Sequence, residues 1–133
     1  MKKLSLIPLT LLLSSCIFTA KFDSVEYSYV TQIRTISQLS RKHCDDMSYM
    51  RDKTQQMTEL SLTLVHYSEH LPNNNPTYNM SKELFNIVEP MHNRYLTVSR
   101  VSKTYCEEKL IGQEHVQRHN RKIVGKERHF TLV

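Results

Sequence analysis

LPNNNPT, at residues 71–77, is the only strong turn signal in this chain of 133 residues. Its two prolines and three asparagines favour a chain reversal, because proline cannot continue a helix and asparagine tolerates turn conformations. From Leu9 to Leu71 there is neither glycine nor proline, and the whole chain holds only two glycines and four prolines. An all-β fold needs many turns, so this scarcity predicts an all-α fold.

A helical pattern of apolar residues precedes the turn. Asp23, with Glu26 three residues on, resembles a capping box at the start of a helix. Every seventh residue from Phe22 is apolar except His43, and further apolar residues fall between them at helical spacing. These residues are Phe22, Tyr29, Ile36, Met50, Met57, Leu64 and Leu71, with Val25, Ile33, Leu39, Met47, Leu60 and Tyr67 between them. The pattern, close to a coiled-coil heptad, predicts one helix from about residue 24 to 70.

A second apolar stripe follows the turn, from Met80 to Tyr105. Ser81 is a candidate N-cap, and Pro90 is expected to kink or restart the helix. Gly112 is a natural stop. The sequence therefore predicts a long antiparallel helical hairpin. A break in the first helix, together with a kink at Pro90, would instead give a small helical bundle.

The first sixteen residues have the layout of a secretory signal peptide. Lys2 and Lys3 precede a short apolar run, which ends in Leu13-Ser14-Ser15-Cys16. That ending resembles the lipobox of bacterial lipoproteins. The resemblance implies that Cys16 receives diacylglycerol and becomes the first residue of the mature protein. An ordinary signal peptide cleaved near Ala20 is the alternative.

In the lipoproteins that the sequence resembles, an aspartate directly after the cysteine favours retention in the inner membrane. This chain has Ile17 there. We therefore expect a lipid anchor in the outer membrane, with the body facing the periplasm, and exposure on the cell surface is the alternative.

With Cys16 lipidated, Cys44 and Cys106 remain as a pair in an oxidising compartment, where a disulfide is expected. Cys44 lies 30 residues before Asn74, and Cys106 lies 31 residues after Asn75. In a hairpin these two positions face each other, so we predict an inter-helix disulfide. Closing a loop of about 60 residues would stabilise the fold by ~4 kcal/mol.

Four segments follow from these patterns: a signal peptide at 1–15, the lipidated cysteine and a linker at 16–21, a helical domain at 22–112, and a basic tail at 113–133. Charges balance from Cys16 to Leu110, and the excess of Lys and Arg after Leu110 belongs to the tail. The tail could attract anionic lipid headgroups. No dense basic face indicates nucleic-acid binding, and we expect none.

The start of the first helix lacks an obvious partner if the second helix stops near Gly112. These unpaired residues are Phe22, Val25, Tyr29, Ile33 and Ile36. We expect them to bind a protein partner or a second copy of the chain. The alternative is that the second helix passes Gly112 and covers them through Ile111, His115, His119 and Ile123.

No catalytic signature, cofactor motif or strong metal motif is present, and we expect a non-enzyme. His66 with His70, and His115 with His119, have the i, i+4 spacing of zinc ligands. A long hairpin would hold the two pairs ~45 Å apart, so we predict surface histidines with no shared metal. The methionines at 47, 50 and 57 are expected to be core, and soft copper ligands or an adaptable binding surface are the alternatives.

We therefore expect a lipid-anchored helical adaptor that binds a secretion or envelope assembly. The layout of lipobox, helical body and one disulfide is loosely similar to that of pilotins, the small lipoproteins that pilot such assemblies. The alternative is an exclusion or immunity lipoprotein encoded by a plasmid or phage.

Overall fold

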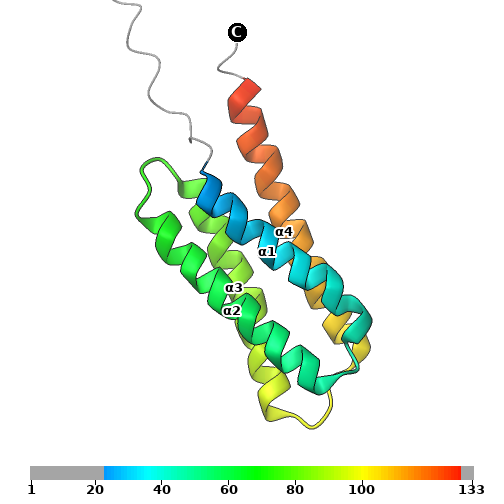
Figure 1. Cartoon of the computed structure of the whole chain (residues 1–133). Helices are drawn as coiled ribbons and strands as arrows, with labels where there is room; N and C mark the ends of the chain where they lie inside the picture. The colour runs from blue at the N-terminus through cyan, green and yellow to red at the C-terminus, as the bar shows by residue number, and fades with distance from the viewer. Residues whose placement is uncertain (1–22, 130–133) are drawn as a thin grey trace, which may run out of the picture.

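The computed structural model describes residues 23–129, with side chains to residue 121, and it shows four helices packed together (Figure 1). Their bounds are α1 Ser24–Ser40, α2 Met47–Glu69, α3 Asn75–Thr97 and α4 Lys103–His129, with a short 3-10 helix η1 at Arg41–His43. Successive helices run in opposite directions, as in an up-and-down bundle. The predicted all-α fold class is confirmed.

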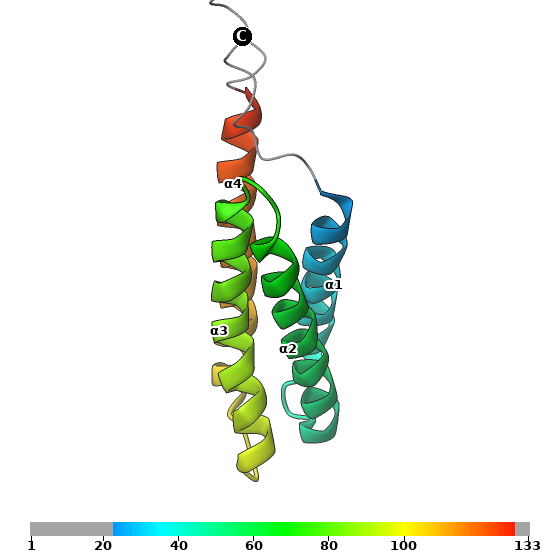
Figure 2. The ribbon, with the colours of Figure 1, turned by 90° about the vertical axis from the view of Figure 1, so that its left-hand side faces the viewer.

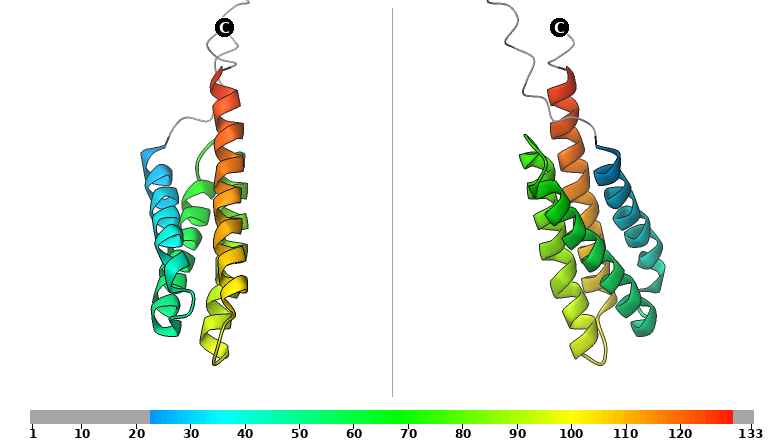
Figure 3. Two further views of the ribbon diagram at one scale, coloured as in Figure 1. Left: turned by 90° about the vertical axis from the view of Figure 1, so that its right-hand side faces the viewer. Right: turned by 60° about the vertical axis from the view of Figure 1, so that its left-hand side comes forward.

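The α2–α3 hairpin forms the centre of the bundle, with α1 packed mainly on α2 and α4 mainly on α3. The contact between α1 and α4 is the least extensive of the four packed pairs (Figure 2). We call the end with Asp23, the α2–α3 turn and the end of α4 the terminal pole. The opposite end, with the connections at 41–46 and 98–102, is the disulfide pole (Figure 3).

The predicted helix over 24–70 is wrong, because it breaks between α1 and α2. Asp46 starts a new helix there: its side chain accepts a hydrogen bond of 2.9 Å from the backbone N–H of Tyr49. Its own N–H donates to the carbonyl of His43 at 2.9 Å, which closes a turn. The first predicted helix is thus interrupted by an aspartate that caps the start of α2, although this part of the chain contains no glycine or proline.

The second predicted helix also breaks, between Thr97 and Lys103. Val101 is buried in this connection, and the hydroxyl of Ser102 accepts from the N–H of Tyr105 at 3.3 Å. The two breaks convert the predicted long hairpin into the alternative, a small helical bundle.

Cys44 and Cys106 are bonded, with their Cα atoms 5.8 Å apart, so the predicted disulfide is confirmed. Both cysteines lie at the same pole because the two predicted long helices each reverse there. Cys44 and Cys106 lie next to these two reversals. The bond therefore joins the start of α4 to the connection before α2.

The predicted stop at Gly112 is wrong. Helix α4 continues through it to His129, so the predicted domain boundary at 112 falls inside a helix. A single glycine inside a helix costs only about 1 kcal/mol relative to alanine. Buried side chains on both sides, Leu110 and Gln113, show that the bundle holds this segment in place.

Helix α3 begins earlier than predicted, at Asn75, with Pro76 in its first turn. Proline is suited to that position because its missing N–H has no helical partner there. Ser81 is not the N-cap; it lies inside α3, and its hydroxyl donates to the carbonyl of Tyr78 at 2.7 Å. Pro90 also lies within α3, which continues past it to Thr97, so the expected restart near Glu89 is wrong.

Two apolar clusters form the core. The larger lies toward the disulfide pole and the smaller toward the terminal pole. The larger contains Cys44, Met50, Met57, Val88, Met91, Tyr95, Val101, Cys106 and Leu110. The smaller contains Ile33, Leu64, Met80 and Leu84. Met50 and Met57 are fully buried, which confirms their assignment to the core.

Helix α4 supplies an intramolecular partner for α1. Ile33 is fully buried in the smaller cluster, where Val116 of α4 also packs. Ile33 therefore has a partner within the chain, and α4 passes Gly112 as the alternative predicts. Of the residues that the alternative names, Ile111, His115 and His119 are exposed, and the side chain of Ile123 lies outside the described part of the structure.

Candidate functional site

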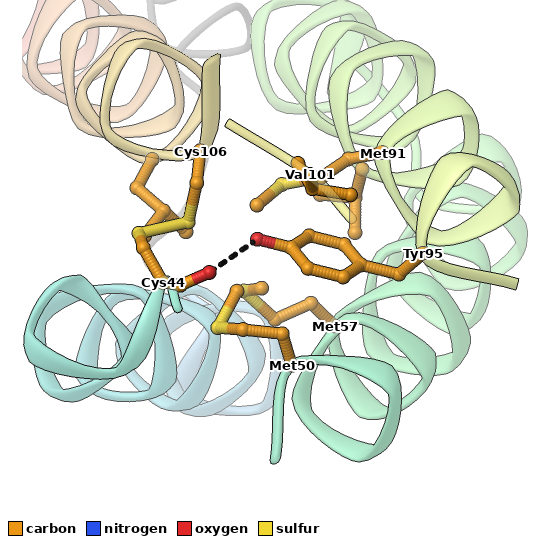
Figure 4. Close-up of a cluster of buried hydrophobic side chains, with 9 residues drawn as sticks. Cys44, Met50, Met57, Met91, Tyr95, Val101 and Cys106 are labelled. Carbon is orange, nitrogen blue, oxygen red and sulfur yellow. Dashed lines mark hydrogen bonds between the residues drawn. A yellow bond between two sulfur atoms is a disulfide. The ribbon is translucent and has the colours of Figure 1, made fainter. Parts of the chain in front are cut away.

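The disulfide pole is a cross-linked end of the bundle. Cys44 and Cys106 are both buried, and the phenol of Tyr95 lies beside their bond (Figure 4). Its hydroxyl donates a hydrogen bond of 3.2 Å to the carbonyl of Cys44. Arg51 in turn donates through Nε to the carbonyl of Tyr95 at 2.8 Å, which satisfies a C-terminal carbonyl of α3. Tyr95 thus links α3 to the disulfide and, through Arg51, to α2.

The phenol of Tyr95 stays neutral well above physiological pH. Burial raises the pKa of Tyr95 to about 12, and the negative charges of Asp45 and Tyr105 act in the same direction. Desolvation disfavours the phenolate, whereas the neutral hydroxyl is the form that donates to Cys44. Tyr95 is therefore a fixed structural donor.

Aromatic rings paired with cations surround this pole. The rings of His43 and Tyr49 lie 4.3 Å apart, and Nζ of Lys53 lies 5.7 Å from the centroid of Tyr49. The guanidinium of Arg94 lies 4.2 Å from the centroid of Tyr105. Cations over aromatic faces are attracted by the ring quadrupole. The two tyrosine side chains, both partly exposed, are held in place by these neighbours.

Two leucines at the same pole are exposed to solvent. Leu39, in the last turn of α1, is 61% exposed, and Leu96, in the last turn of α3, is 55% exposed. Leu39 belongs to the apolar pattern of the first predicted helix, yet it faces solvent. Tyrosine and arginine are enriched among the residues that dominate binding at protein interfaces. Exposed leucines and braced tyrosines on a cross-linked end make this pole the candidate binding site.

Polar side chains make several links between α1 and α4, beside the apolar cluster in which Ile33 and Val116 pack. Ser37 donates to the carbonyl of Leu110 at 3.2 Å, and Arg34 donates through Nε to Oε1 of Gln117 at 2.9 Å. A further polar link to α4 is the ion pair of Arg41 with Glu114 at 2.6 Å. Apolar periodicity does not reveal these polar links.

Gln113 is a buried amide of α4, one turn before Gln117. Its side chain is fully buried, yet neither its amide nitrogen nor its amide oxygen has a hydrogen-bond partner among the described residues. The buried hydroxyl of Ser40 also lacks a partner within that part of the chain. Unsatisfied buried polar groups cost free energy, so these two side chains reduce the stability of the bundle.

The terminal pole is held by a second polar cluster. Asp23 caps α1 by accepting from the N–H groups of Val25 and Glu26 at 2.8 and 2.9 Å. The predicted cap is confirmed, but the Glu26 carboxylate does not complete a capping box. It is buried, and it accepts from the Ser68 hydroxyl at 2.7 Å and from the amide of Asn74. These contacts join the start of α1 to the α2–α3 turn.

A groove of about 340 Å³ lies at the terminal pole between α3 and α4. It is lined by Asn75, Pro76, Asn79, Met80, Glu83, Val116, His119 and Asn120. Because α4 returns to this pole, the long hairpin from which the separation of ~45 Å between the two histidine pairs follows does not exist. Within residues 23–121, no group of three or more His, Cys, Asp or Glu is placed to hold a metal ion.

Two of the predicted site residues, Cys16 and Phe22, lie outside the described residues. Of the other four proposed partner-binding residues, Val25 is 41% exposed and Ile33 is fully buried. Tyr29 and Ile36 are partly buried against the smaller and the larger cluster respectively. Partner binding by this set as a whole would require Ile33 at the surface, whereas its side chain belongs to the core.

Comparison with protein-family models, curated proteins and solved structures finds no match for this chain. None of the helices in the described part of the chain has the length and apolar character needed to span a bilayer.

Proposed function

We propose that this chain is a lipid-anchored helical protein of the bacterial envelope, attached to the outer membrane and facing the periplasm. It acts as a binding module for a protein of a secretion or envelope assembly. The observation that carries the proposal is that the two poles of the bundle differ. Both ends of the described chain leave from the terminal pole, and a disulfide cross-links the disulfide pole.

The tether between the proposed anchor and the bundle is short. Asp23 follows Cys16 by seven residues, and a fully extended chain of that length spans at most ~25 Å. A lipid on Cys16 would therefore hold the terminal pole close to the bilayer. The 23 residues of α2 are about 35 Å long, so the disulfide pole would stand well away from the membrane.

The disulfide pole offers the features of a protein-binding surface. Its cross-link and the Tyr95 hydrogen bond fix the backbone, and a fixed surface loses less conformational freedom on binding. Leu39 and Leu96 supply apolar area, while Tyr49, Tyr105 and their cations supply directional contacts. The fitting partner is a protein surface that combines apolar side chains with carboxylates.

The test of this role is a pair of substitutions at the pole, Leu39→Asp with Leu96→Asp. Both side chains are exposed, so the fold should persist. A photocrosslinking residue at Ser99, an exposed position in the 98–102 connection, should give a discrete adduct in cells that the double substitution removes.

Leu62→Asp is the matched control, because Leu62 is 39% exposed but lies well inside α2, away from the pole. It should leave the adduct unchanged. An adduct that survives the double substitution, or that Leu62→Asp removes equally, contradicts the assignment of the binding surface to this pole.

The anchor itself is tested by Cys16→Ser. Only a thiol can form the thioether to diacylglycerol, so this variant should take up no radiolabelled palmitate and should accumulate as precursor. Continued labelling of Cys16→Ser would contradict lipidation at this residue.

A further inference from the structure

The end of α4 projects beyond the rest of the bundle. Asn120 lines the terminal groove together with Asn75 and Pro76, so it lies level with the start of α3. Helix α4 continues for nine residues past Asn120 to His129, which is about 14 Å of helix. The ribbon views show this extension passing the α2–α3 turn (Figure 2).

This projecting segment is basic. From residue 121 to 129 it carries Arg121, Lys122, Lys126 and Arg128 against a single acidic residue, Glu127. Arg118, Lys122 and Lys126 follow one another at i, i+4 spacing, so their positions share one face of α4. The segment therefore brings positive charge to the pole from which the proposed anchor leaves.

The cationic character begins inside the described bundle. Burial lowers the pKa of the Arg34 guanidinium, and repulsion from Arg121 and Arg118 lowers this pKa further. Attraction to Tyr27 and Glu114 raises it. Of these acidic partners, Glu114 already pairs with Arg41 and Arg118. Arginines that repel one another at the surface gain stability when an anion binds near them.

We infer that the C-terminal extension of α4 binds the anionic headgroups of the phospholipid bilayer to which the protein is anchored. A tether of at most ~25 Å keeps this end near the surface, and the extension itself covers about 14 Å of that distance. A lipid anchor combined with a basic segment binds membranes more stably than one chain alone. The contact also orients the bundle, so that the disulfide pole points away from the bilayer.

This inference rests on the proposed anchor for its biological setting, but its test does not. The first helix begins after Asp23, so a chain that starts at Ile17 retains every described contact and carries no lipid. The measurement is co-sedimentation of this chain with vesicles of phosphatidylglycerol and phosphatidylethanolamine, and with vesicles of phosphatidylcholine alone. Binding to the anionic vesicles only, weakened by salt, is expected.

The decisive variant carries Lys122→Gln, Lys126→Gln and Arg128→Gln. Each basic residue near an anionic surface raises the membrane partition coefficient by up to about fivefold. Loss of three such residues should therefore lower that coefficient roughly 100-fold. The matched control carries Lys42→Gln, Arg100→Gln and Lys103→Gln, three exposed residues at the disulfide pole. It has the same net charge and should bind as the unaltered chain does.

Three results would overturn the inference: no binding to anionic vesicles, equal loss in the two triple variants, or full competition by inorganic phosphate at matched phosphate concentration. The last result would identify a free-phosphate site. Melting temperatures of both variants verify that the bundle is intact. Vesicle binding by the lipid-free chain and palmitate labelling of Cys16 are independent readouts, so either proposal can fail without the other.

Discussion

The phenol of Tyr95 donates a hydrogen bond to the carbonyl of Cys44, a residue 51 positions earlier in the chain, at a distance of 3.2 Å. Tyr95→Phe removes the donor and leaves a buried carbonyl unsatisfied. We expect a loss of about 1–2 kcal/mol in the free energy of unfolding at pH 7, measured by urea denaturation.

The same hydrogen bond has a pH signature. The pKa of Tyr95 is raised from 10.0 to about 12 in the folded protein, so between these values the unfolded chain loses a proton that the folded chain keeps. The contribution of Tyr95 to stability is therefore complete below pH 10 and falls as the pH rises toward 12. The stability gap between the wild type and Tyr95→Phe should narrow at about pH 11. A gap that widens would contradict a neutral buried phenol.

Gly112→Ala should stabilise the protein. Gly112 lies inside α4, and a Cβ added there would meet only Cδ1 of Ile87 at 4.0 Å, which is an ordinary contact. Replacing glycine by alanine in a helix interior gains about 1 kcal/mol, which raises the melting temperature by several degrees in a domain of this size. A lower melting temperature would show that α4 does not continue through this position.

Ile33→Ala and Val25→Ala separate core from surface on α1. Ile33 is fully buried and Val25 is 41% exposed. We expect Ile33→Ala to cost about 2–5 kcal/mol and Val25→Ala to change stability by no more than about 0.5 kcal/mol. If calorimetry finds the same small change in stability for both variants, the result would instead favour the prediction that the apolar stripe of α1 has no partner within the chain.

Gln113→Met replaces a buried amide, which has no hydrogen-bond partner among the described residues, by an apolar side chain of similar length. The variant should be more stable by about 1 kcal/mol in urea denaturation, because the cost of an unsatisfied buried amide is removed. Gln55→Met makes the same chemical change at an exposed position of α2 and should have little effect. Destabilisation by Gln113→Met would reveal a partner for the amide.

The sequence is sufficient for the helical class, the α2–α3 turn and the disulfide, because each has a local signal: prolines with asparagines, apolar periodicity, and two cysteines equidistant from the turn. The sequence does not reveal the break between α1 and α2 or the break between α3 and α4. Asp46 and Ser102 act as N-caps, but aspartate and serine also occur on exposed helix faces, so neither residue marks a break by itself.

The site is less predictable than the fold. Ser37, Arg34 and Gln117 make polar links between α1 and α4, and a search for apolar stripes does not find such links. Leu39 is exposed in the last turn of α1, next to the break that the apolar periodicity does not predict. The pair of cysteines shows which positions of the two segments lie side by side, but it does not reveal the reversals, because two straight antiparallel helices would bring the same cysteines together.

The most direct test of the account is the orientation of the lipidated protein on a membrane. A fluorophore is placed either at Glu69, exposed at the terminal pole, or at Ser99, exposed at the disulfide pole, and energy transfer to acceptor lipids in anionic vesicles is measured. The poles are about 35 Å apart along α2, so transfer should be strong from position 69 and weak from position 99. Equal transfer from both positions, or stronger transfer from position 99, would contradict a bundle anchored at its terminal pole.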